Sequence, residues 1–264
     1  LSCFQKKTSM KIPLFLLLSF LLFSCTSTET PEAPPALGVG ELIDLQLAGE
    51  VHDFHEEVKS DRITTRRFKH ADVASIIKGL DPSVFEVKTA GRSIEGRDIY
   101  LVKYGQGPVK VLLWSQMHGN EPTATMALMD LFNFLQEDEA FPEFKAMLHN
   151  ELSLYFIPML NPDGAEYFER RNALGVDLNR DALRLQSPEA QLLKSVRDSL
   201  DADWGFNLHD QNRYYAAGIA PYTASISFLA PAYNYEKEVD EKRGDAMQLI
   251  SAMNEVLQQY IPNM

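Results

Sequence analysis

Cysteine is almost missing from this sequence of 264 residues. It contains two cysteines, Cys3 and Cys25, and both lie in or before an N-terminal leader. We therefore expect the folded part of the chain to have no disulfide bond, no thiolate nucleophile and no cysteine ligand for a metal ion. The chain also has no G-x-S-x-G nucleophile elbow and no G-x-x-x-x-G-K-[ST] phosphate loop, so nothing supports a serine hydrolase or a P-loop enzyme.

Positive charge is scarce as well. The chain has 25 Lys and Arg against 37 Asp and Glu, which gives a formal net charge of −12. Phosphate binding needs clustered Lys and Arg, so this balance argues against a nucleic-acid partner. The hydrophobic share of 45% and the charged share of 23% are ordinary for a globular domain, and the length allows a sizeable core.

No apolar run is long enough for a membrane-spanning helix, which needs about 20 residues. The longest is the stretch I-P-L-F-L-L-L-S-F-L-L-F that follows Lys11, and its length is typical of a signal-peptide core. The sequence L-F-S-C that ends at Cys25 resembles a bacterial lipobox, whose cysteine is acylated and becomes the mature N-terminus. Met10 is then the natural start. An ordinary signal peptide, with Cys25 incidental, is the alternative.

These features divide the chain into three parts. Residues 1–25 are expected to be the leader, and residues 26–40, which begin with a Pro- and Thr-rich stretch, a flexible tether. Residues 41–264 are expected to form one catalytic domain. The leader predicts export to the bacterial cell envelope and a lipid anchor in the membrane at Cys25, on the periplasmic or outer side.

The domain alternates strand-like and helix-like patterns. Mixed helical signals over 41–80 precede five apolar or alternating runs that predict strands. The expected strands are 85–88, 98–104, 109–115, 152–159 and 204–208. Helical spacing or capping residues predict helices over 122–135, 188–200 and 246–260. This order predicts an α/β fold with a mixed, mainly parallel central sheet and helices on both faces.

Polar residues stand where these strands end, which is where such sheets place their ligands. His118 follows the strand at 109–115 and His209 ends the strand at 204–208. His118 and Glu121 lie three residues apart in H-G-N-E, just before a helix, so both can reach one metal ion. Catalytic zinc takes three protein ligands and leaves the fourth position to water. A lone H-x-x-E is common by chance, however, and later motifs decide the matter.

Two such motifs follow the strand at 152–159. They are N-P-D-G at 161–164 and R-R-N-A-L-G-V-D-L-N-R at 170–180. Together with H-G-N-E and His209, they make the chain resemble the zinc metallocarboxypeptidases of the carboxypeptidase A/B type. The resemblance covers residues 62–235. It implies a carboxypeptidase-like fold, one zinc ion and a peptide substrate with a free C-terminal carboxylate.

The resemblance also implies a role for each matching residue. His118, Glu121 and His209 correspond to the zinc ligands, and Asp177 to a carboxylate that orients the first ligand. Arg170, seven residues before Asp177, matches the arginine that polarises the scissile carbonyl. The adjacent Arg171 competes for that role. The pair that binds the substrate's terminal carboxylate is matched by Asn179 and Arg180.

Each role makes physical sense. A guanidinium aimed at a developing oxyanion contributes on the order of 3 kcal/mol. Arginine binds a carboxylate through a bidentate fork, which selects a free chain end over an internal peptide bond. A carboxylate behind a histidine ligand fixes its tautomer. The alternatives are a surface salt bridge for Arg180 and a helix or turn cap for Asp177.

The chain departs from the family in three places. The family's general-base Glu lies on a late strand, and counting from His209 places it past Met264. We therefore expect either a chain truncated at its C-terminus or a variant without the base. Asp210-Gln211 replace the Ser-Tyr of the digestive enzymes, which puts their specificity pocket in doubt. The family's capping Tyr has no clear counterpart; Tyr260 falls in a helical pattern.

The remaining histidines carry no such pattern. His52 and His55 stand three apart but are expected on a solvated face, and His70 and His149 have no partner nearby. The sequence thus predicts a zinc-dependent metallocarboxypeptidase that hydrolyses C-terminal peptide bonds through a zinc-bound water. The alternatives are a zinc amidohydrolase or deacylase of the aspartoacylase type, and a zinc-containing binding protein without catalysis.

Overall fold

The computed structural model describes residues 2–5, 44–212, 214–216 and 223–261. Cys25 and the expected tether lie outside these residues. No helix within the described ranges has both the length and the apolar character to cross a membrane.

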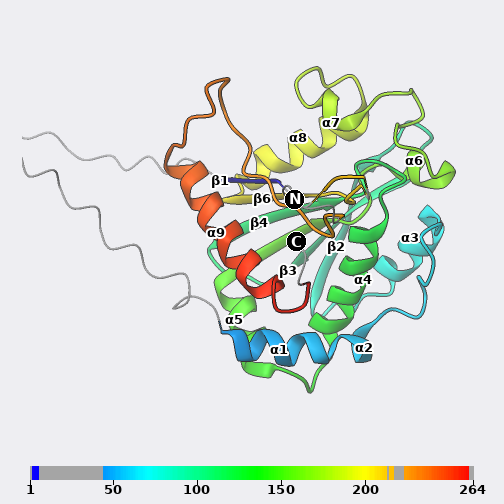
Figure 1. The fold of residues 1–264 in the computed structure, drawn as a ribbon. Helices are drawn as coiled ribbons and strands as arrows, with labels where there is room; N and C mark the ends of the chain where they lie inside the picture. The colour runs from blue at the N-terminus through cyan, green and yellow to red at the C-terminus, as the bar shows by residue number, and fades with distance from the viewer. Residues whose placement is uncertain (1, 6–43, 213, 217–222, 262–264) are drawn as a thin grey trace, which may run out of the picture.

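One six-stranded sheet forms the centre of the molecule, in the order β1-β6-β4-β5-β3-β2 (Figure 1). The strands are β1 (Ser2–Gln5), β2 (Phe85–Arg92), β3 (Asp98–Tyr104), β4 (Val109–Ser115), β5 (Leu152–Ile157) and β6 (Trp204–Leu208). Strand β4 runs parallel to both β5 and β6, and the other three pairings are antiparallel. The sheet is therefore mixed, with three parallel strands at its centre, as the sequence predicts.

Helices cover both faces of this sheet (Figure 1). They are α1 (Leu45–Asp53), α2 (His55–Val58), α3 (His70–Lys78), α4 (Thr123–Gln136), α5 (Pro142–Glu151), α6 (Pro162–Tyr167), α7 (Leu178–Asp181), α8 (Pro188–Leu200) and α9 (Glu241–Leu257). Neighbouring residues of β5 show the two layers, because strand side chains alternate between faces. Phe156 packs into a core with Phe132 of α4, whereas Ile157 packs into a second core with Val196 of α8.

Five strands and two long helices fall close to their predicted ranges. Helix α4 starts one residue after Pro122, and the strand expected over 152–159 ends at Ile157. Helix α9 begins earlier than expected because the Asp240 side chain accepts a hydrogen bond from the Arg243 backbone N–H and caps it. Strand β1 lies in the segment assigned to the leader, where no element was expected.

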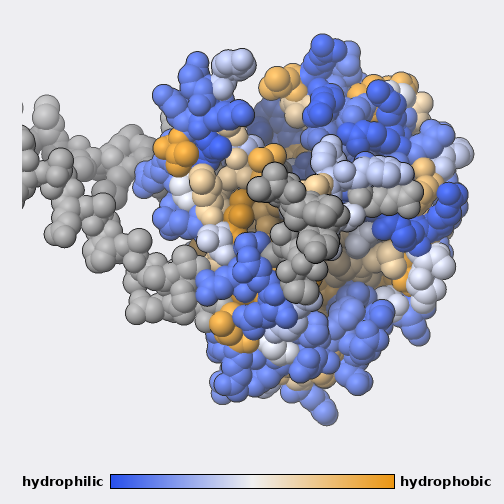
Figure 2. Space-filling model, in the orientation of Figure 1, coloured by the Kyte–Doolittle hydropathy of each residue, from blue (hydrophilic) through white to orange (hydrophobic). Residues whose placement is uncertain are grey.

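The face of the molecule drawn in Figure 2 is largely hydrophilic. In the view of Figure 2 hydrophilic side chains cover most of the surface, and apolar residues show mainly toward the middle of this face, beside α9. Apolar residues fill the cores on the two faces of the sheet.

Two of the sequence motifs touch through their backbones. A Cβ atom added at Gly119, in H-G-N-E, would stand 1.9 Å from the carbonyl carbon of Gly164 in N-P-D-G, and 2.2 Å from the N of Ala165. No side chain fits there. Asn161 fastens the same contact, since its Oδ1 accepts from the Gly164 N–H at 2.9 Å and its Nδ2 donates to the Met117 carbonyl at 3.3 Å. Glycine at position 119 therefore brings the two loops together.

Gly119→Ala should lower the free energy of unfolding by at least about 1–3 kcal/mol, because backbone rather than a flexible side chain must move. Gly244→Ala in α9 is the matched control. Its Cβ would meet nothing closer than Val239 Cγ1 at 3.9 Å, so helix propensity should keep or raise stability by up to about 1 kcal/mol. Urea denaturation measures both variants, and an equal effect would contradict the close approach.

Candidate metal centre

The parallel strands β4 and β6 bring two histidines to one edge of the sheet. Their C-terminal ends are adjacent, with Ser115 paired to Leu208, so His118 and His209 leave the sheet side by side. Glu121 stands between them, immediately before Pro122 and α4. One possible ligand atom from each of the three side chains lies within 4.8 Å of the others. The structure therefore brings together the three residues proposed as ligands.

Glu121 lies between the two rings. Its Oε1 is 2.8 Å from His118 Nδ1, and its Oε2 is 2.7 Å from His209 Nδ1. The His118 side chain is 2% exposed, against 16% for Glu121 and 23% for His209. The cluster is thus closed on the His118 side and opens to solvent beside His209.

Asp177 holds the far side of the His118 ring. Its Oδ1 is 3.1 Å from His118 Nε2, so Asp177 can accept the hydrogen on that nitrogen while Nδ1 faces the cluster. The same Oδ1 accepts from the Asn179 backbone N–H at 3.0 Å and caps α7. Asp177 therefore caps α7 and contacts His118 at the same time, so the cap does not exclude the predicted orienting role.

Of the two adjacent arginines, Arg170 reaches the cluster. Its Nε donates to Asp177 Oδ2 at 3.0 Å, and its Nη1 is 3.3 Å from Glu121 Oε1 and 3.1 Å from His118 Nδ1. Arg171 instead donates to the Gly175 carbonyl at 2.8 Å, within its own turn. The Arg170 side chain is 43% exposed, so a ligand in the open site can contact its guanidinium.

Asn179 and Arg180 lie on the single turn of α7 that begins at Asp177. The Arg180 side chain is exposed and has no hydrogen bond or ion pair among the described residues. The surface salt bridge considered as its alternative role is therefore not formed in the described part of the chain. Asn179 borders a cavity on the α8 face of the sheet.

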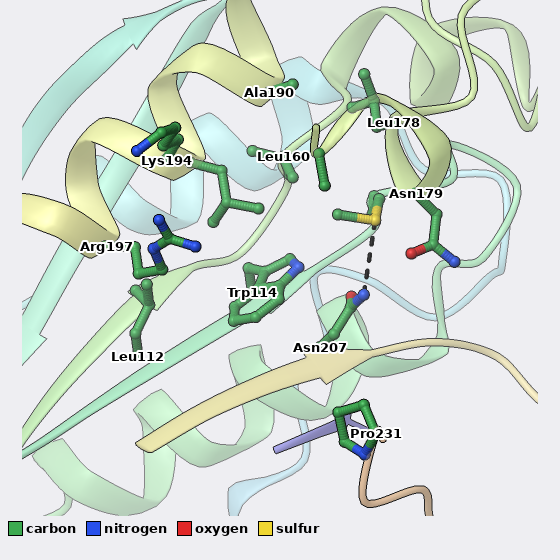
Figure 3. A pocket seen from close by; sticks show the side chains of 13 residues that line it. Leu112, Trp114, Leu160, Leu178, Asn179, Ala190, Lys194, Arg197, Asn207 and Pro231 are labelled. Carbon is green, nitrogen blue, oxygen red and sulfur yellow. Dashed lines mark hydrogen bonds between the residues drawn. The ribbon is translucent and has the colours of Figure 1, made fainter. Parts of the chain in front are cut away.

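That cavity has a volume of about 370 Å³ and is lined by residues of β4, β6, α7 and α8 (Figure 3). Its walls are mainly apolar and include Leu112, Trp114, Leu160, Leu178 and Leu193. Asn207 Nδ2 contacts Met117 Sδ at 3.6 Å, the dashed line in Figure 3. Asn207 Oδ1 and Trp114 Nε1 are buried without a hydrogen-bond partner in the described protein.

Two buried polar residues that the sequence analysis did not single out, Asn172 and Glu189, support the loop between Arg170 and Asp177. Asn172 Oδ1 accepts from the backbone N–H of Leu174 and Val176, and its Nδ2 donates to Glu189 Oε2 at 3.1 Å. Glu189 also accepts from the Ile94 N–H at 3.2 Å.

Asp163, a third buried polar residue, holds the turn at 93–97. It accepts hydrogen bonds from Ser93 Oγ at 2.6 Å and from Arg97 Nη1 at 2.7 Å. Glu189 and Asp163 are both fully buried. In the sequence, only their positions could indicate such a role: Asp163 lies within N-P-D-G and Glu189 lies in the first turn of α8.

The charges of the cluster favour ionised carboxylates. Burial raises the pKa of Glu121, but hydrogen bonds from His118 and His209 outweigh burial and bring that pKa from its ordinary 4.5 to about 2. Burial likewise raises the pKa of Asp177, and the hydrogen bond with His118 and the charge of Arg170 reverse the shift, so its pKa is lowered. By contrast, burial raises the pKa of Glu189.

The other histidines have ordinary partners. His52 stacks on Tyr260 at 4.1 Å, and His55 Nε2 lies 3.3 Å from Asp130 Oδ2. His70 Nε2 lies 2.8 Å from the Asp98 carbonyl. Within the described ranges, His118, Glu121 and His209 are the one group of three that could hold a metal ion.

The donor set fits zinc. Two imidazole nitrogens and one carboxylate make a common catalytic set for this ion, and the tautomer of His118 is set from behind by a carboxylate. The opening beside His209 leaves room for a fourth, non-protein ligand. Arg170 Nη1 now lies against His118 Nδ1. A bound metal ion would displace it from there, and the guanidinium could then turn toward the fourth ligand.

His118→Ala and His209→Ala should each abolish stoichiometric zinc, because two remaining protein ligands bind the ion weakly. Metal analysis of the purified protein by inductively coupled plasma spectrometry measures this. His149→Ala, which removes a histidine outside the cluster, should keep the wild-type zinc content. Full zinc retention in both cluster variants would rule out the site.

The metal-free protein should show the lowered Glu121 pKa in its stability. A carboxyl whose folded pKa lies below its unfolded value contributes stability above the unfolded pKa, near 4.5, and loses it as the pH falls toward 2. The difference in unfolding free energy between wild type and Glu121→Gln should therefore narrow from pH 5.5 to pH 3. Denaturation at each pH measures this difference, and a constant difference would contradict the shift.

The chain is similar to known carboxypeptidases over part of its length. The chain is 25% identical over 174 residues to carboxypeptidase SOL1 of Arabidopsis thaliana, covering 54% of this chain and 35% of that protein. It is 28% identical over 141 residues to the carboxypeptidase N catalytic chain of Homo sapiens, covering 45% and 31%. The chain thus spans about a third of the length of these relatives.

Among solved structures, a metallo-carboxypeptidase from Burkholderia cenocepacia is 24% identical with a TM-score of 0.49, covering 58% of this chain and 44% of that one. The sequence model that describes zinc carboxypeptidases matches residues 73–225. That range contains the three clustered side chains, Arg170 and α7. The chain belongs to the zinc carboxypeptidase family.

Proposed function

We propose that this protein is a zinc-dependent metallocarboxypeptidase that removes residues from the C-terminus of peptides. The observation that carries the proposal is the cluster of His118, Glu121 and His209 with Arg170 against it, beside the turn that presents Asn179 and Arg180. One zinc ion, when bound, lowers the pKa of a water ligand to about 7 and so supplies a nucleophile at neutral pH.

Arg170 is proposed to hold the scissile carbonyl oxygen. Arg170 forms ion pairs with Asp177 and Glu121, and its side chain is 43% exposed. A guanidinium anchored through Nε can keep Asp177 while Nη1 turns to the substrate. Because it is fixed before charge develops on the oxygen, it stabilises the transition state with little reorganisation.

Arg180 and Asn179 are proposed to bind the terminal carboxylate of the substrate. The Arg180 guanidinium is exposed and unpaired in the described part of the chain, so it need not break an ion pair to accept a ligand. Asp177 caps the turn that carries both residues, and the same carboxylate holds His118. Terminal carboxylate and metal are therefore held at a fixed spacing, which favours hydrolysis one residue from a free chain end.

The general base is proposed to be a glutamate outside these 264 residues. Each carboxylate that the described residues bring against the three ligands is already engaged. Glu121 is itself a ligand, Asp177 holds His118, and Asp210 is bound to Arg66 and Thr123. The two glutamates of α9, Glu241 and Glu255, are exposed.

The location proposed for this activity is the bacterial cell envelope. An acylated Cys25 would fasten the protein to the membrane, and residues 26–40 would tether the catalytic domain to that anchor. The support is the apolar stretch before L-F-S-C and the Pro- and Thr-rich sequence after it.

Arg180→Ala should lower kcat/KM on peptides with a free C-terminus by about 10- to 100-fold, the value of a charge-assisted hydrogen bond. The same peptides with amidated ends should be affected far less. Arg184→Ala, which removes an exposed arginine one turn further on, is the control and should leave both substrates near wild type. The assay uses the product of the complete gene, with and without a chelator.

The same assay separates the alternatives. Equal losses on free and amidated ends would remove the exopeptidase proposal and favour a deacylase that does not read the terminal carboxylate. No chelator-sensitive turnover on a broad peptide panel, cell-wall peptides included, would favour a zinc-containing binding protein.

A further inference from the structure

Asp210 joins three segments of the chain beside the metal centre. Its Oδ1 accepts from the backbone N–H of Thr123 at 3.0 Å, and its Oδ2 accepts from the Thr123 hydroxyl at 3.0 Å. Its Oδ2 also accepts from Arg66 Nη2 at 2.6 Å. Thr123 is the first residue of α4 and Asp210 directly follows His209. The side chain therefore fastens the end of β6 to the start of the helix that follows Glu121.

The two histidines of the cluster are held in different ways. His118 is buried, and Asp177 accepts the hydrogen on its Nε2. His209 is more exposed, and among the described residues no hydrogen-bond partner reaches its Nε2. Apart from the Glu121 contact at its Nδ1, the orientation of His209 depends on the backbone that carries it, and the first side-chain anchor after it is Asp210.

The contacts of Asp210 connect His209 to Glu121. The Asp210 backbone N–H points to Glu121 Oε2 at 3.4 Å, while the Asp210 carboxylate holds the helix end two residues after Glu121. The ligand carried by β6 and the ligand that precedes α4 are thus fixed to each other through one side chain that is 11% exposed. Three donors thus converge on the Asp210 carboxylate, and the backbone N–H of the same residue approaches Glu121.

We infer that Asp210 is a positioning residue for the third metal ligand. It takes no part in ligation or in contact with substrate. It aligns His209 with Glu121 by clamping the β6 end to α4, as Asp177 aligns His118 through its ring. The inference rests on the proposed metal centre. It assigns a role to Asp210, the first residue of the Asp-Gln pair that stands where the digestive enzymes have Ser-Tyr.

Arg66 completes the clamp from outside the matched family range. Its Nη1 donates to Thr123 Oγ1 at 2.6 Å while its Nη2 binds Asp210, so the guanidinium spans both partners. Arg66 lies seven residues before residue 73, where the family match begins. The segment that precedes α3 thus contributes to the geometry of the metal centre, 144 residues away from Asp210 in sequence.

The test compares zinc affinity and cobalt spectra across matched variants of the whole chain. Asp210→Ala should weaken zinc binding by about 10- to 100-fold, the usual effect of losing a partner behind the ligands. It should also shift the visible absorption of the cobalt(II)-substituted protein, which reports ligand geometry. Asp210→Asn should fall between, because its Oδ1 still accepts from the Thr123 N–H. Competition with a chromogenic chelator gives the affinities.

Asp203→Ala is the matched control at the opposite end of β6. Asp203 Oδ2 accepts from the Lys110 N–H at 2.9 Å, so its loss weakens the same strand away from the metal. It should lower the thermal unfolding midpoint yet leave zinc affinity and the cobalt spectrum unchanged. Equal zinc affinities in the Asp210 and Asp203 variants would overturn the inference. A wild-type protein that holds no zinc would instead remove the metal centre itself.

Discussion

The carboxylate of Asp177 is the contact on which the site most depends. It binds His118 Nε2, Arg170 and the backbone N–H of Asn179 at once. One side chain therefore sets the tautomer of a metal ligand, the direction of the guanidinium beside it and the start of α7. Burial makes such a charge costly unless it is paired, and here three donors surround it. Asp177 therefore couples the candidate metal cluster to the turn that carries Asn179 and Arg180.

The scaffold explains why Asp177 can act in this way. Two parallel strands deliver His118 and His209 to one edge, and the backbone contact between Gly119 and Gly164 presses the two loops together. Buried polar contacts, Asn172 with Glu189 and Asp163 with the turn at 93–97, then shape the loop that carries Arg170. Buried contacts of this kind hold the ligands and Arg170 in fixed positions, and catalysis requires such fixed positions of the reacting groups.

Much of this organisation could be predicted from the sequence. Buried strands appear as apolar runs and long helices as a 3.6-residue period, so the sequence predicts β2 to β6, α4, α8 and most of α9. The order of the motifs predicts the metal cluster. Helices α6 and α7 were missed, because four to six residues show no period. The choice of Arg170 over Arg171, and the Asp210 clamp, depend on contacts between distant segments that no local pattern contains.

The central claim is a zinc ion held by His118, Glu121 and His209. Crystals of the purified protein, measured with X-rays just above and just below the zinc absorption edge, test it most directly. The account predicts one anomalous peak that touches the Nδ1 atoms of both histidines and the Glu121 carboxylate, with Asp177 still on His118 Nε2. A protein without a peak at this position, or a histidine that binds through Nε2 with Asp177 displaced, would contradict it.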